Sequence, residues 1–244
     1  APASKILLDE ISKHSSSNLL EIGCGAGDVA ESVLAISKGS TIDAMDISYN
    51  ILILAEERVG KVNGINFIHG DAEIYKFKDY FYDLVYSRFG VMFFDNPKMA
   101  FKNIKRSIKK NGKLVFLSWN KIENNPWMDY PSQAAFKVLS QPEKQKENSP
   151  GAFSLSELTV IKETLINSGF SNVDSHKYNI NINLGKLEQA VHFATQLGPA
   201  ATPYAEAGDS QKNEARAAIE DELSKFKDNE NIVLPGSCWL TIAD

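Results

Sequence analysis

Short apolar runs alternate with amphipathic stretches along the first half of the chain. The amphipathic stretches carry apolar residues three and four positions apart, as a helix with one buried face does. The expected strands cover residues 19–22, 41–45, 65–68, 83–86 and 113–119, and the expected helices cover 5–14, 28–37, 49–59 and 97–108. Strands that alternate with helices in this way form a parallel sheet with helices on both faces. The pattern predicts an α/β fold with a doubly wound, mostly parallel sheet.

The second half of the chain is less regular. Residues 120–151 are rich in asparagine, proline and charge, and they interrupt the alternation. The later spacing predicts helices at 155–168, 186–197 and 210–226 and strands at 173–182 and 237–242. The first of these helices opens on Ser154-Leu155-Ser156-Glu157, which has the spacing of a capping box. We expect one domain, residues 1–244, on a Rossmann-like seven-stranded sheet, with substrate-side helical and loop insertions at about 120–153 and 185–235.

Composition changes this picture little. Apolar residues make up 43% of the chain and charged residues 23%, which are ordinary values for a globular protein. No apolar run is long enough to cross a bilayer and the front has no signal-peptide pattern, so we expect a cytoplasmic protein without membrane insertion. The formal charge of −5 argues against a nucleic-acid partner. The chain starts at Ala1-Pro2 without a methionine, which suggests that a front segment is missing.

The cysteine and histidine content indicates neither a disulfide framework nor a metal site. The two cysteines, Cys24 and Cys238, are expected to be buried thiols in a reducing compartment. No group of histidines and cysteines has the spacing of metal ligands, so we expect no metal.

The stretch from Leu19 to Gly27 joins the first expected strand to a helix through three glycines at alternate positions. Glycine permits positive φ and lets the backbone approach a ligand closely. Such a turn at the carboxyl edge of a parallel sheet forms a ligand cradle. A tight turn without a ligand also uses glycine, so the stretch is a weak signal by itself.

Acidic residues follow the next two expected strands. Asp46 lies 23 positions after Gly23, where a carboxylate can accept hydrogen bonds from both hydroxyls of a ribose. Asp71 follows the third strand and is placed to accept a hydrogen bond from an adenine amine. Acids at strand ends also serve as helix caps or as solvated loop charges, so each alone decides little. Their order at successive strand ends favours a nucleoside-containing cofactor.

These residues resemble the class I S-adenosylmethionine-dependent methyltransferases. Glu21 to Gly27 is similar to their first cofactor motif, Asp46 to the ribose-binding acid, and Gly70-Asp71-Ala72 to the adenine-binding turn. Further segments resemble the menaquinone- and ubiquinone-biosynthesis-like bacterial group, and they bring the resemblance to nearly the whole chain: residues 87–94, Trp119, 125–127, 150–153 and 197–199.

The resemblance implies an enzyme with S-adenosylmethionine as cofactor, S-adenosylhomocysteine as product and an antiparallel last strand. The cofactor-binding residues that it implies are Glu21, Gly23, Cys24, Gly25, Asp46, Ile47, Asp71, Ala72 and Ser87. A dehydrogenase is the rival with the same fold. A dinucleotide fingerprint has its third glycine at the position of Asp28, where a carboxylate would face a pyrophosphate at a helix N-terminus. S-adenosylmethionine carries no phosphate, so the methyltransferase is favoured.

Arg88 and Ser87 follow the fourth expected strand, the edge at which class I enzymes contact the methyl group and the acceptor. A guanidinium suits bidentate recognition of a carboxylate, and an ionised carboxylate needs no base. We therefore expect these two residues to be catalytic, in O-methylation of a carboxylate on a small molecule or peptide terminus. A structural arginine that bonds loop carbonyls or Asp95 is the other interpretation.

Two other functions remain open. One is C-, N- or hydroxyl O-methylation of an apolar small molecule, and the other is a non-catalytic cofactor-binding or scaffolding protein. Six aromatic residues could line an apolar acceptor pocket or belong to the core: Phe89, Phe93, Phe94, Trp119, Trp127 and Phe153. The basic residues from Lys102 to Lys110 are expected on the solvated outer face of the helix that starts at Pro97.

Overall fold

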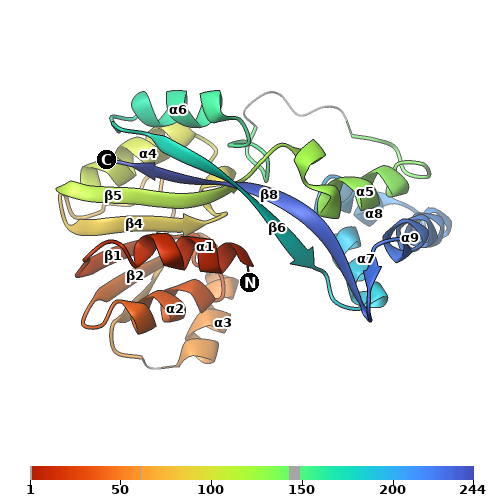
Figure 1. Ribbon diagram of the computed structural model, residues 1–244, viewed down its shortest axis with the longest axis horizontal. Helices are drawn as coiled ribbons and strands as arrows, with labels where there is room; N and C mark the ends of the chain where they lie inside the picture. Colours follow the sequence, from red (N-terminus) through yellow and green to blue (C-terminus); the bar gives the residue numbers. More distant parts are fainter. Residues whose placement is uncertain (1, 61, 143–148) are drawn as a thin grey trace. The chain divides into compact units, whose positions relative to one another are not determined.

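A computed structural model describes residues 2–60, 62–142 and 149–244 (Figure 1). In chain order the elements are α1 (Pro2–Ile11), β1 (Asn18–Ile22), α2 (Asp28–Ile36), β2 (Thr41–Asp46), α3 (Tyr49–Val59), β3 (Ile65–His69), β4 (Tyr82–Arg88), the 3₁₀ turn η1 (Val91–Phe93), α4 (Pro97–Ser107), β5 (Ile108–Trp119), η2 (Ile122–Asn124), α5 (Pro126–Ala135), α6 (Leu158–Ile166), β6 (Asp174–Asn183), α7 (Leu187–Gln196), α8 (Ala201–Glu206), α9 (Asp209–Ser224), β7 (Lys227–Asp228) and β8 (Asn231–Ala243).

The sheet is doubly wound, as predicted. Its strands run β3-β2-β1-β4-β5-β8-β6, and the two-residue β7, which was not predicted, pairs with β8. The pairs β1–β2, β2–β3, β1–β4 and β4–β5 are parallel, and β5–β8 is antiparallel as expected. The strand order reverses between β1 and β4, and in open α/β sheets ligands bind at the carboxyl ends of the strands at this switch point.

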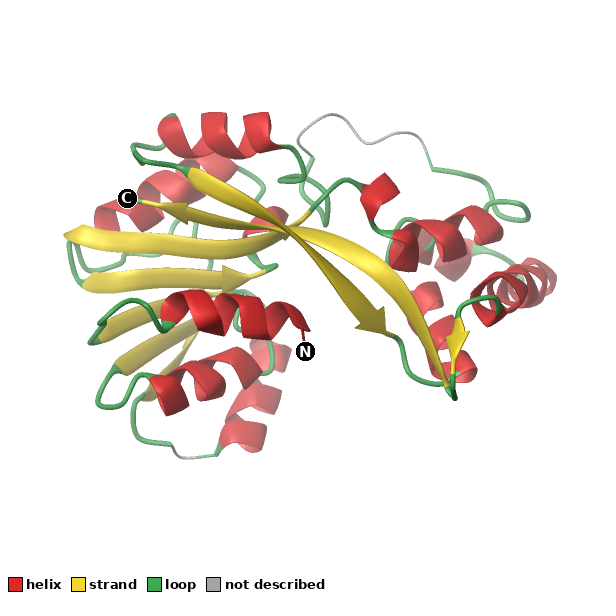
Figure 2. Ribbon diagram, viewed as in Figure 1, coloured by secondary structure: helices red, strands yellow, loops and turns green. Residues whose placement is uncertain are grey.

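Helices cover both faces of the parallel strands (Figure 2). On one face α2 contacts α1 and α3, and on the other α4 contacts α6. Leu20 and Ile22 of β1 belong to a buried cluster with Phe101 of α4 and Ile161 of α6. Side chains alternate along a strand, so Glu21, between these two apolar residues, points to the face that carries α1 and α2.

Two predicted boundaries are wrong. The capping box is absent, because Ser154 donates its hydroxyl to the Met92 carbonyl (2.5 Å) and α6 begins only at Leu158. The helix α4 ends at Ser107, so Lys109 and Lys110 lie in β5 instead of on a solvated helix face. The predicted start of α4 is confirmed, since Asn96 Oδ1 accepts a hydrogen bond from Met99 N (3.0 Å) and caps the helix.

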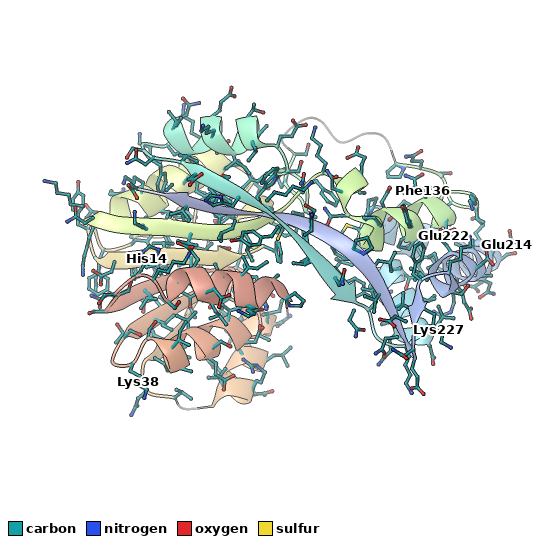
Figure 3. The ribbon with its side chains drawn as sticks, in the orientation of Figure 1. His14, Lys38, Phe136, Glu214, Glu222 and Lys227 are labelled. Carbon is teal, nitrogen blue, oxygen red and sulfur yellow. The ribbon has the colours of Figure 1, made fainter. Side chains whose placement is uncertain are left out.

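The chain contacts divide the protein into two compact units. The first comprises residues 1–119, 148–178 and 238–244, and the second comprises 120–147 and 179–237. The second unit thus draws on both segments that were expected to be insertions, and residues 143–148 of the first segment lie outside the described residues. In the second unit α9 contacts α5 and α7, and Figure 3 marks Phe136 after α5 and Glu222 on α9.

Cys24 and Cys238 are buried free thiols, as predicted. Among the described residues, none of the helices has both the length and the apolar character to span a bilayer.

Candidate functional site

The glycine turn between β1 and α2 is closed by protein on one side and open on the other. Gly23, Gly25 and Gly27 have φ values of 69°, 54° and 78°, in the left-handed region that a Cβ penalises. A Cβ at Gly23 would lie 2.9 Å from the Cα of Gly90, so the turn packs directly on the loop after β4. A Cβ at Gly25 would meet no atom within 4 Å. The open side at Gly25 leaves room for a ligand beside the backbone.

Asp46, the last residue of β2, ties this turn to its neighbouring strand. Its Oδ2 accepts a hydrogen bond from Gly25 N (2.9 Å), and its Oδ1 accepts one from Ser48 N (2.9 Å). Each carboxylate oxygen has further acceptor capacity, so Asp46 can still bind hydroxyl groups. Ile47, the next residue, is 68% exposed and presents an apolar surface beside the carboxylate.

The loop after β3 is held in place from two sides. Asp71 Oδ1 accepts a hydrogen bond from Glu73 N (2.9 Å). Asn103 of α4 donates its side-chain amide to the carbonyl of the buried Ala72 (2.8 Å) and to that of Tyr75 (2.8 Å). This fixed loop brings Asp71 to the same carboxyl edge of the sheet as Asp46, as the sequence predicts.

Glu21 is a carboxyl group inside the protein, with 1% of its surface exposed. Tyr86 Oη donates a hydrogen bond to its Oε2 (3.3 Å). Burial raises the pKa of Glu21 to about 8, while the positive charge of Arg88 and the Tyr86 hydrogen bond oppose that rise. The charges of Asp28 and Asp46 raise the pKa further. A carboxyl with this pKa loses its proton when a cation binds nearby.

Arg88, the last residue of β4, forms a bidentate ion pair within the chain. Its Nη1 and Nη2 donate to the two carboxylate oxygens of Asp28 (2.7 and 2.9 Å), and Nη1 also donates to Ser4 Oγ (2.7 Å). The pair joins β4 to the first residue of α2 and to α1. A structural arginine was expected to bond loop carbonyls or an acid such as Asp95, and the acid that Arg88 contacts in the structure is Asp28.

Ser87 is placed differently from the prediction that it faces the acceptor. Its side chain is fully buried, and its Oγ donates to the Ile22 carbonyl (2.7 Å) and accepts from Gly90 N (3.1 Å). Both hydrogen bonds are made to the backbone, one on each side of the Gly23–Gly90 contact. Ser87 therefore acts as a clamp between β1 and the loop after β4, and its hydroxyl does not reach solvent.

An aromatic pair lies at the carboxyl ends of β4 and β5. The rings of Phe89 and Trp119 are stacked, with centroids 4.0 Å apart and an interplanar angle of 7°. Phe89 has a φ of 64°, a rare conformation for a bulky residue that is held only where the surroundings enforce it. Among the other aromatic candidates, Phe94 and Trp127 are buried and Phe93 is 59% exposed. The stack is the aromatic surface nearest in sequence to Arg88.

Four residues that shape this site were not predicted as site residues from the sequence: Ser4, Tyr86, Gly90 and Asn103. Tyr86 lies two positions before Arg88, so the alternation of side chains along a strand puts both on one face and could have identified it, and the structure pairs it with Glu21. Gly90 could have been suspected as the partner of a glycine turn. Ser4 and Asn103 act through contacts that bridge separate elements and leave no local pattern in the sequence.

Comparison with known proteins agrees with this geometry. The model of the family described as "Methyltransferase domain" matches residues 20–116. A Schizosaccharomyces pombe protein, uncharacterized methyltransferase C25B8.09, is 30% identical over 174 residues, which are 70% of this chain and 67% of that protein. The chain belongs to the class I S-adenosylmethionine-dependent methyltransferases.

Bacterial relatives agree with the resemblance to the menaquinone- and ubiquinone-biosynthesis-like group. Malonyl-[acyl-carrier protein] O-methyltransferase 2 of Ilyobacter polytropus is 33% identical over 104 residues, 43% of this chain and 40% of that protein. Demethylmenaquinone methyltransferase of Staphylococcus aureus is 29% identical over 117 residues, 46% of this chain and 47% of that protein. The matches thus span less than half the length of these relatives.

A solved structure shows the shared fold. The structure of the YcgJ protein from Bacillus subtilis has a TM-score of 0.64 at 15% identity, and the match covers 99% of this chain and 97% of that protein's chain.

The residues at the turn fit the cofactor of this methyltransferase family. Asp46 and Asp71 give the site a negative character that suits a cationic ligand with ribose hydroxyls and an adenine amine, and Glu21 adds to it once a bound cation favours its ionised form. Asp28 occupies the helix position at which a pyrophosphate would bind, and Arg88 neutralises it there. Within the described ranges no group of three or more His, Cys, Asp or Glu side chains is arranged to hold a metal ion.

Proposed function

We propose that the protein transfers a methyl group from S-adenosylmethionine to a carboxylate oxygen of a small molecule or peptide terminus. The observation that carries the proposal is the glycine turn, open at Gly25, with carboxyl groups at the ends of neighbouring strands. The similarity to relatives named malonyl-[acyl-carrier protein] O-methyltransferases supports a carboxylate as acceptor.

The strand ends suggest how the cofactor is held. We assign the ribose hydroxyls to Asp46 and the adenine amine to Asp71, with Ile47 as an apolar contact beside them and Ala72 within the same loop. The backbone of Gly23, Cys24 and Gly25 forms the wall along which the ligand lies. The thiol of Cys24 is a passive part of this wall, because burial raises its pKa far above neutral pH.

Arg88 acts in this proposal as a positioning residue, in place of the acceptor contact that its sequence position suggested. Its guanidinium holds Asp28 at the start of α2, and its charge favours the ionised form of the buried Glu21. Glu21 then supplies the negative charge that attracts the sulfonium and ammonium groups of the cofactor. Ser87 supports the same arrangement by clamping β1 to the loop after β4.

An ionised carboxylate acceptor requires little chemistry from the protein. When bound, the cofactor would supply a methyl group on a positively charged sulfur, so that the acceptor oxygen would form the O–C bond as the electron pair of the broken S–C bond returns to the sulfur. No proton has to be removed, because the acceptor carboxylate is already ionised. The protein must hold the acceptor in line, and the Phe89–Trp119 stack provides an apolar surface for that purpose.

The test is transfer of a radiolabelled methyl group to a panel of carboxylate, amine, phenol and activated-carbon acceptors. We expect label to accumulate on a carboxylate acceptor and to be released as methanol by mild alkali, since methyl esters hydrolyse and N-, C- and ether methyl groups do not. Alkali-stable label would contradict carboxylate methylation. Cofactor binding without S-adenosylhomocysteine formation on every acceptor would favour the scaffolding alternative. The buried free thiols support the proposal of a reducing, cytoplasmic location.

A further inference from the structure

A basic cleft lies at the opposite edge of the sheet from the glycine turn. It has a volume of about 520 Å³ and is formed before β1 and around the starts of β4 and β5. The residues that bear on its chemistry are Lys13, His14, Ser16, Lys109, Lys110 and Lys113. Its lining contains four lysines and one acid, Asp83, in a chain whose formal charge is −5. Glu10 and Asp244 also pair with two of these lysines, so four lysines face three carboxylates and the cleft keeps an excess of positive charge on an acidic protein.

The backbone around the lysines is tightly fixed. The pairing of β4 with β5 changes register between Tyr82 and Leu84, which leaves a bulge in the segment from Lys109 to Gly112. A Cβ at Gly112 would lie 2.8 Å from the Asp83 carbonyl oxygen and 3.0 Å from that of Tyr82. This backbone packs closely against β4, so the side chains of Lys109, Lys110 and Lys113 extend from fixed positions on β5.

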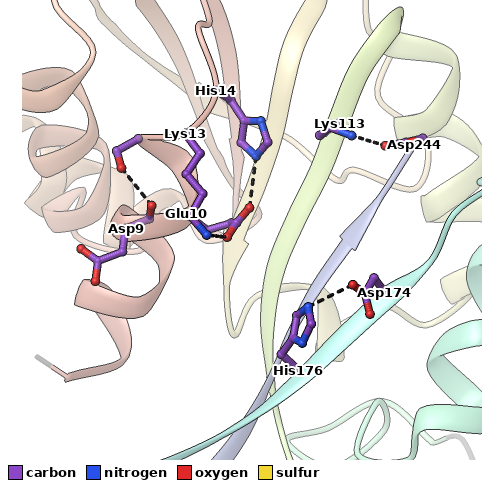
Figure 4. A network of polar contacts seen from close by, with 9 residues as sticks. Asp9, Glu10, Lys13, His14, Lys113, Asp174, His176 and Asp244 are labelled. Atoms are coloured by element: carbon purple, nitrogen blue, oxygen red, sulfur yellow. Dashed lines mark hydrogen bonds and ion pairs between the residues drawn. The ribbon is translucent and has the colours of Figure 1, made fainter.

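Three of the four ammonium groups are oriented by carboxylates but retain free donors. Lys109 pairs with Asp83 (2.7 Å), Lys13 pairs with Glu10 (2.6 Å) and Lys113 pairs with Asp244. Figure 4 shows Lys13 and His14 converging on Glu10 and the Lys113–Asp244 pair between adjacent strands. Each ammonium has three N–H donors, so each pair leaves donors for a further anion. Lys110 is exposed and has no ion pair among the described residues.

Ser16 gives an independent indication of a ligand. Its Oγ is buried and, among the described residues, has no hydrogen-bond partner. Ser16 also lines the cleft. A buried hydroxyl without a partner is destabilising, and a ligand oxygen that accepts its hydrogen bond removes that cost.

We propose that this cleft binds a phosphate-type oxyanion, either inorganic phosphate or the phosphoryl group of a small metabolite, at a site separate from the cofactor. The lysines neutralise the charge of the anion, and Ser16 donates a directed hydrogen bond to one of its oxygens. The volume accommodates more than a single phosphate, so a phosphorylated metabolite fits as well as the free ion.

The test is calorimetric titration with inorganic phosphate and with pyrophosphate at constant ionic strength, with S-adenosylhomocysteine absent or saturating. We expect saturable binding of at least one anion with a Kd of about 0.1–1 mM, unchanged by S-adenosylhomocysteine. A preference for pyrophosphate would support a phosphorylated metabolite, and equal binding would support the free ion. Absence of saturation, or competition with S-adenosylhomocysteine, would overturn the proposal.

Single substitutions locate the site. Lys110→Ala is expected to weaken binding roughly tenfold, which is the loss of one charge-assisted hydrogen bond. Ser16→Ala is expected to weaken it several-fold without lowering the melting temperature, because the hydroxyl has no partner to lose. Lys227→Ala, an exposed lysine of β7 in the other unit, is the matched control and should bind like the unaltered protein. Binding that is equal in all three variants would mean adventitious ion binding only.

Discussion

Glu21 is the residue on which the electrostatics of the site depend. It is fully buried, and its pKa is raised to about 8 mainly by burial. In the unfolded chain its pKa would be near the ordinary value for glutamate, so between about pH 4.5 and pH 8 the folded state holds a proton that the unfolded state has lost. Glu21 therefore lowers the stability of the protein as the pH rises through that window, and a bound cation offsets this loss.

This linkage predicts the pH dependence of ligand binding. The affinity for S-adenosylhomocysteine, whose ammonium group is cationic, should rise with pH until Glu21 is ionised near pH 8. Glu21→Gln should bind more weakly at pH 8.5 and should lose most of this dependence, because the amide cannot ionise. Its melting temperature should fall less between pH 5 and pH 8 than that of the unaltered protein. Calorimetry and thermal melts over this range measure both effects, and identical pH profiles for the two proteins would contradict the assignment.

The proposed role of Arg88 is distinguishable from contact with the acceptor. Removing the guanidinium raises the pKa of Glu21 further, so Arg88→Ala should bind S-adenosylhomocysteine roughly tenfold or more weakly at pH 7.5. The loss should diminish at higher pH, where Glu21 ionises without help. Arg88→Lys keeps the charge without the fork and should bind nearly normally at neutral pH. If Arg88→Ala abolished turnover and left the affinity for S-adenosylhomocysteine unchanged, Arg88 would be a residue that contacts the acceptor instead.

Among the elements, the strand–turn–helix unit β1–turn–α2 is the one that sequence describes best. The strand β1 begins one residue before its predicted start and α2 begins at the predicted Asp28, since apolar periodicity and glycine positions are local properties. The contacts that complete the site are not local. The Gly23–Gly90 packing and the Arg88–Asp28 pair join residues that are far apart in the chain, and only the sheet topology brings them together.

The missed elements have a similar physical explanation. The helix α5 begins at Pro126 within an asparagine-rich stretch whose low apolar periodicity hid it. The capping-box spacing at Ser154 failed because the Met92 carbonyl offered this hydroxyl a tertiary partner. Lys109 and Lys110 continue the helical spacing of basic residues, which is why the helix was predicted to include them. In the structure α4 ends at Ser107, and the buried Ile108 is the first residue of β5.

The glycine turn gives a prediction with a matched control. Gly25 and Gly39 both have positive φ, 54° and 83°, and a Cβ at either would meet no atom within 4 Å. Gly25→Ala and Gly39→Ala should therefore each cost about 1–2 kcal/mol of stability, the penalty of a left-handed alanine. Only Gly25→Ala should lose binding of S-adenosylhomocysteine, because only at Gly25 does the alanine side chain enter the space that the ligand occupies. Equal ligand affinity in the two variants would show that the open side of Gly25 is not used.

At the scale of the whole molecule, the buried side chain of Asn125 links the two chain segments that form the second unit. Asn125 is fully buried, and its Oδ1 accepts hydrogen bonds from Ser237 N (2.9 Å) and Trp127 Nε1 (3.0 Å). Its Nδ2 donates to the carbonyls of Ser237 (3.1 Å) and Asn120 (2.9 Å). Asn125 thus joins the first segment of the unit to its last.

Asn125→Ala should destabilise the protein by about 3 kcal/mol or more, because several buried partners lose their hydrogen bonds at once. Asn213→Ala, at an exposed position of α9 in the same unit, should change stability by less than about 0.5 kcal/mol and serves as the control. Chemical denaturation of both variants measures the difference. A small effect at Asn125 would show that the network does not hold the unit together.

The most direct test of the account is calorimetric titration of the unaltered protein with S-adenosylhomocysteine, with NAD as the comparison ligand. The carboxyl groups around an open glycine turn, with Asp28 where a dinucleotide fingerprint has its third glycine, predict saturable binding of S-adenosylhomocysteine and none of NAD. Binding of NAD, or of neither ligand, would contradict the assignment of the turn as the cofactor site and with it the proposed methyl transfer.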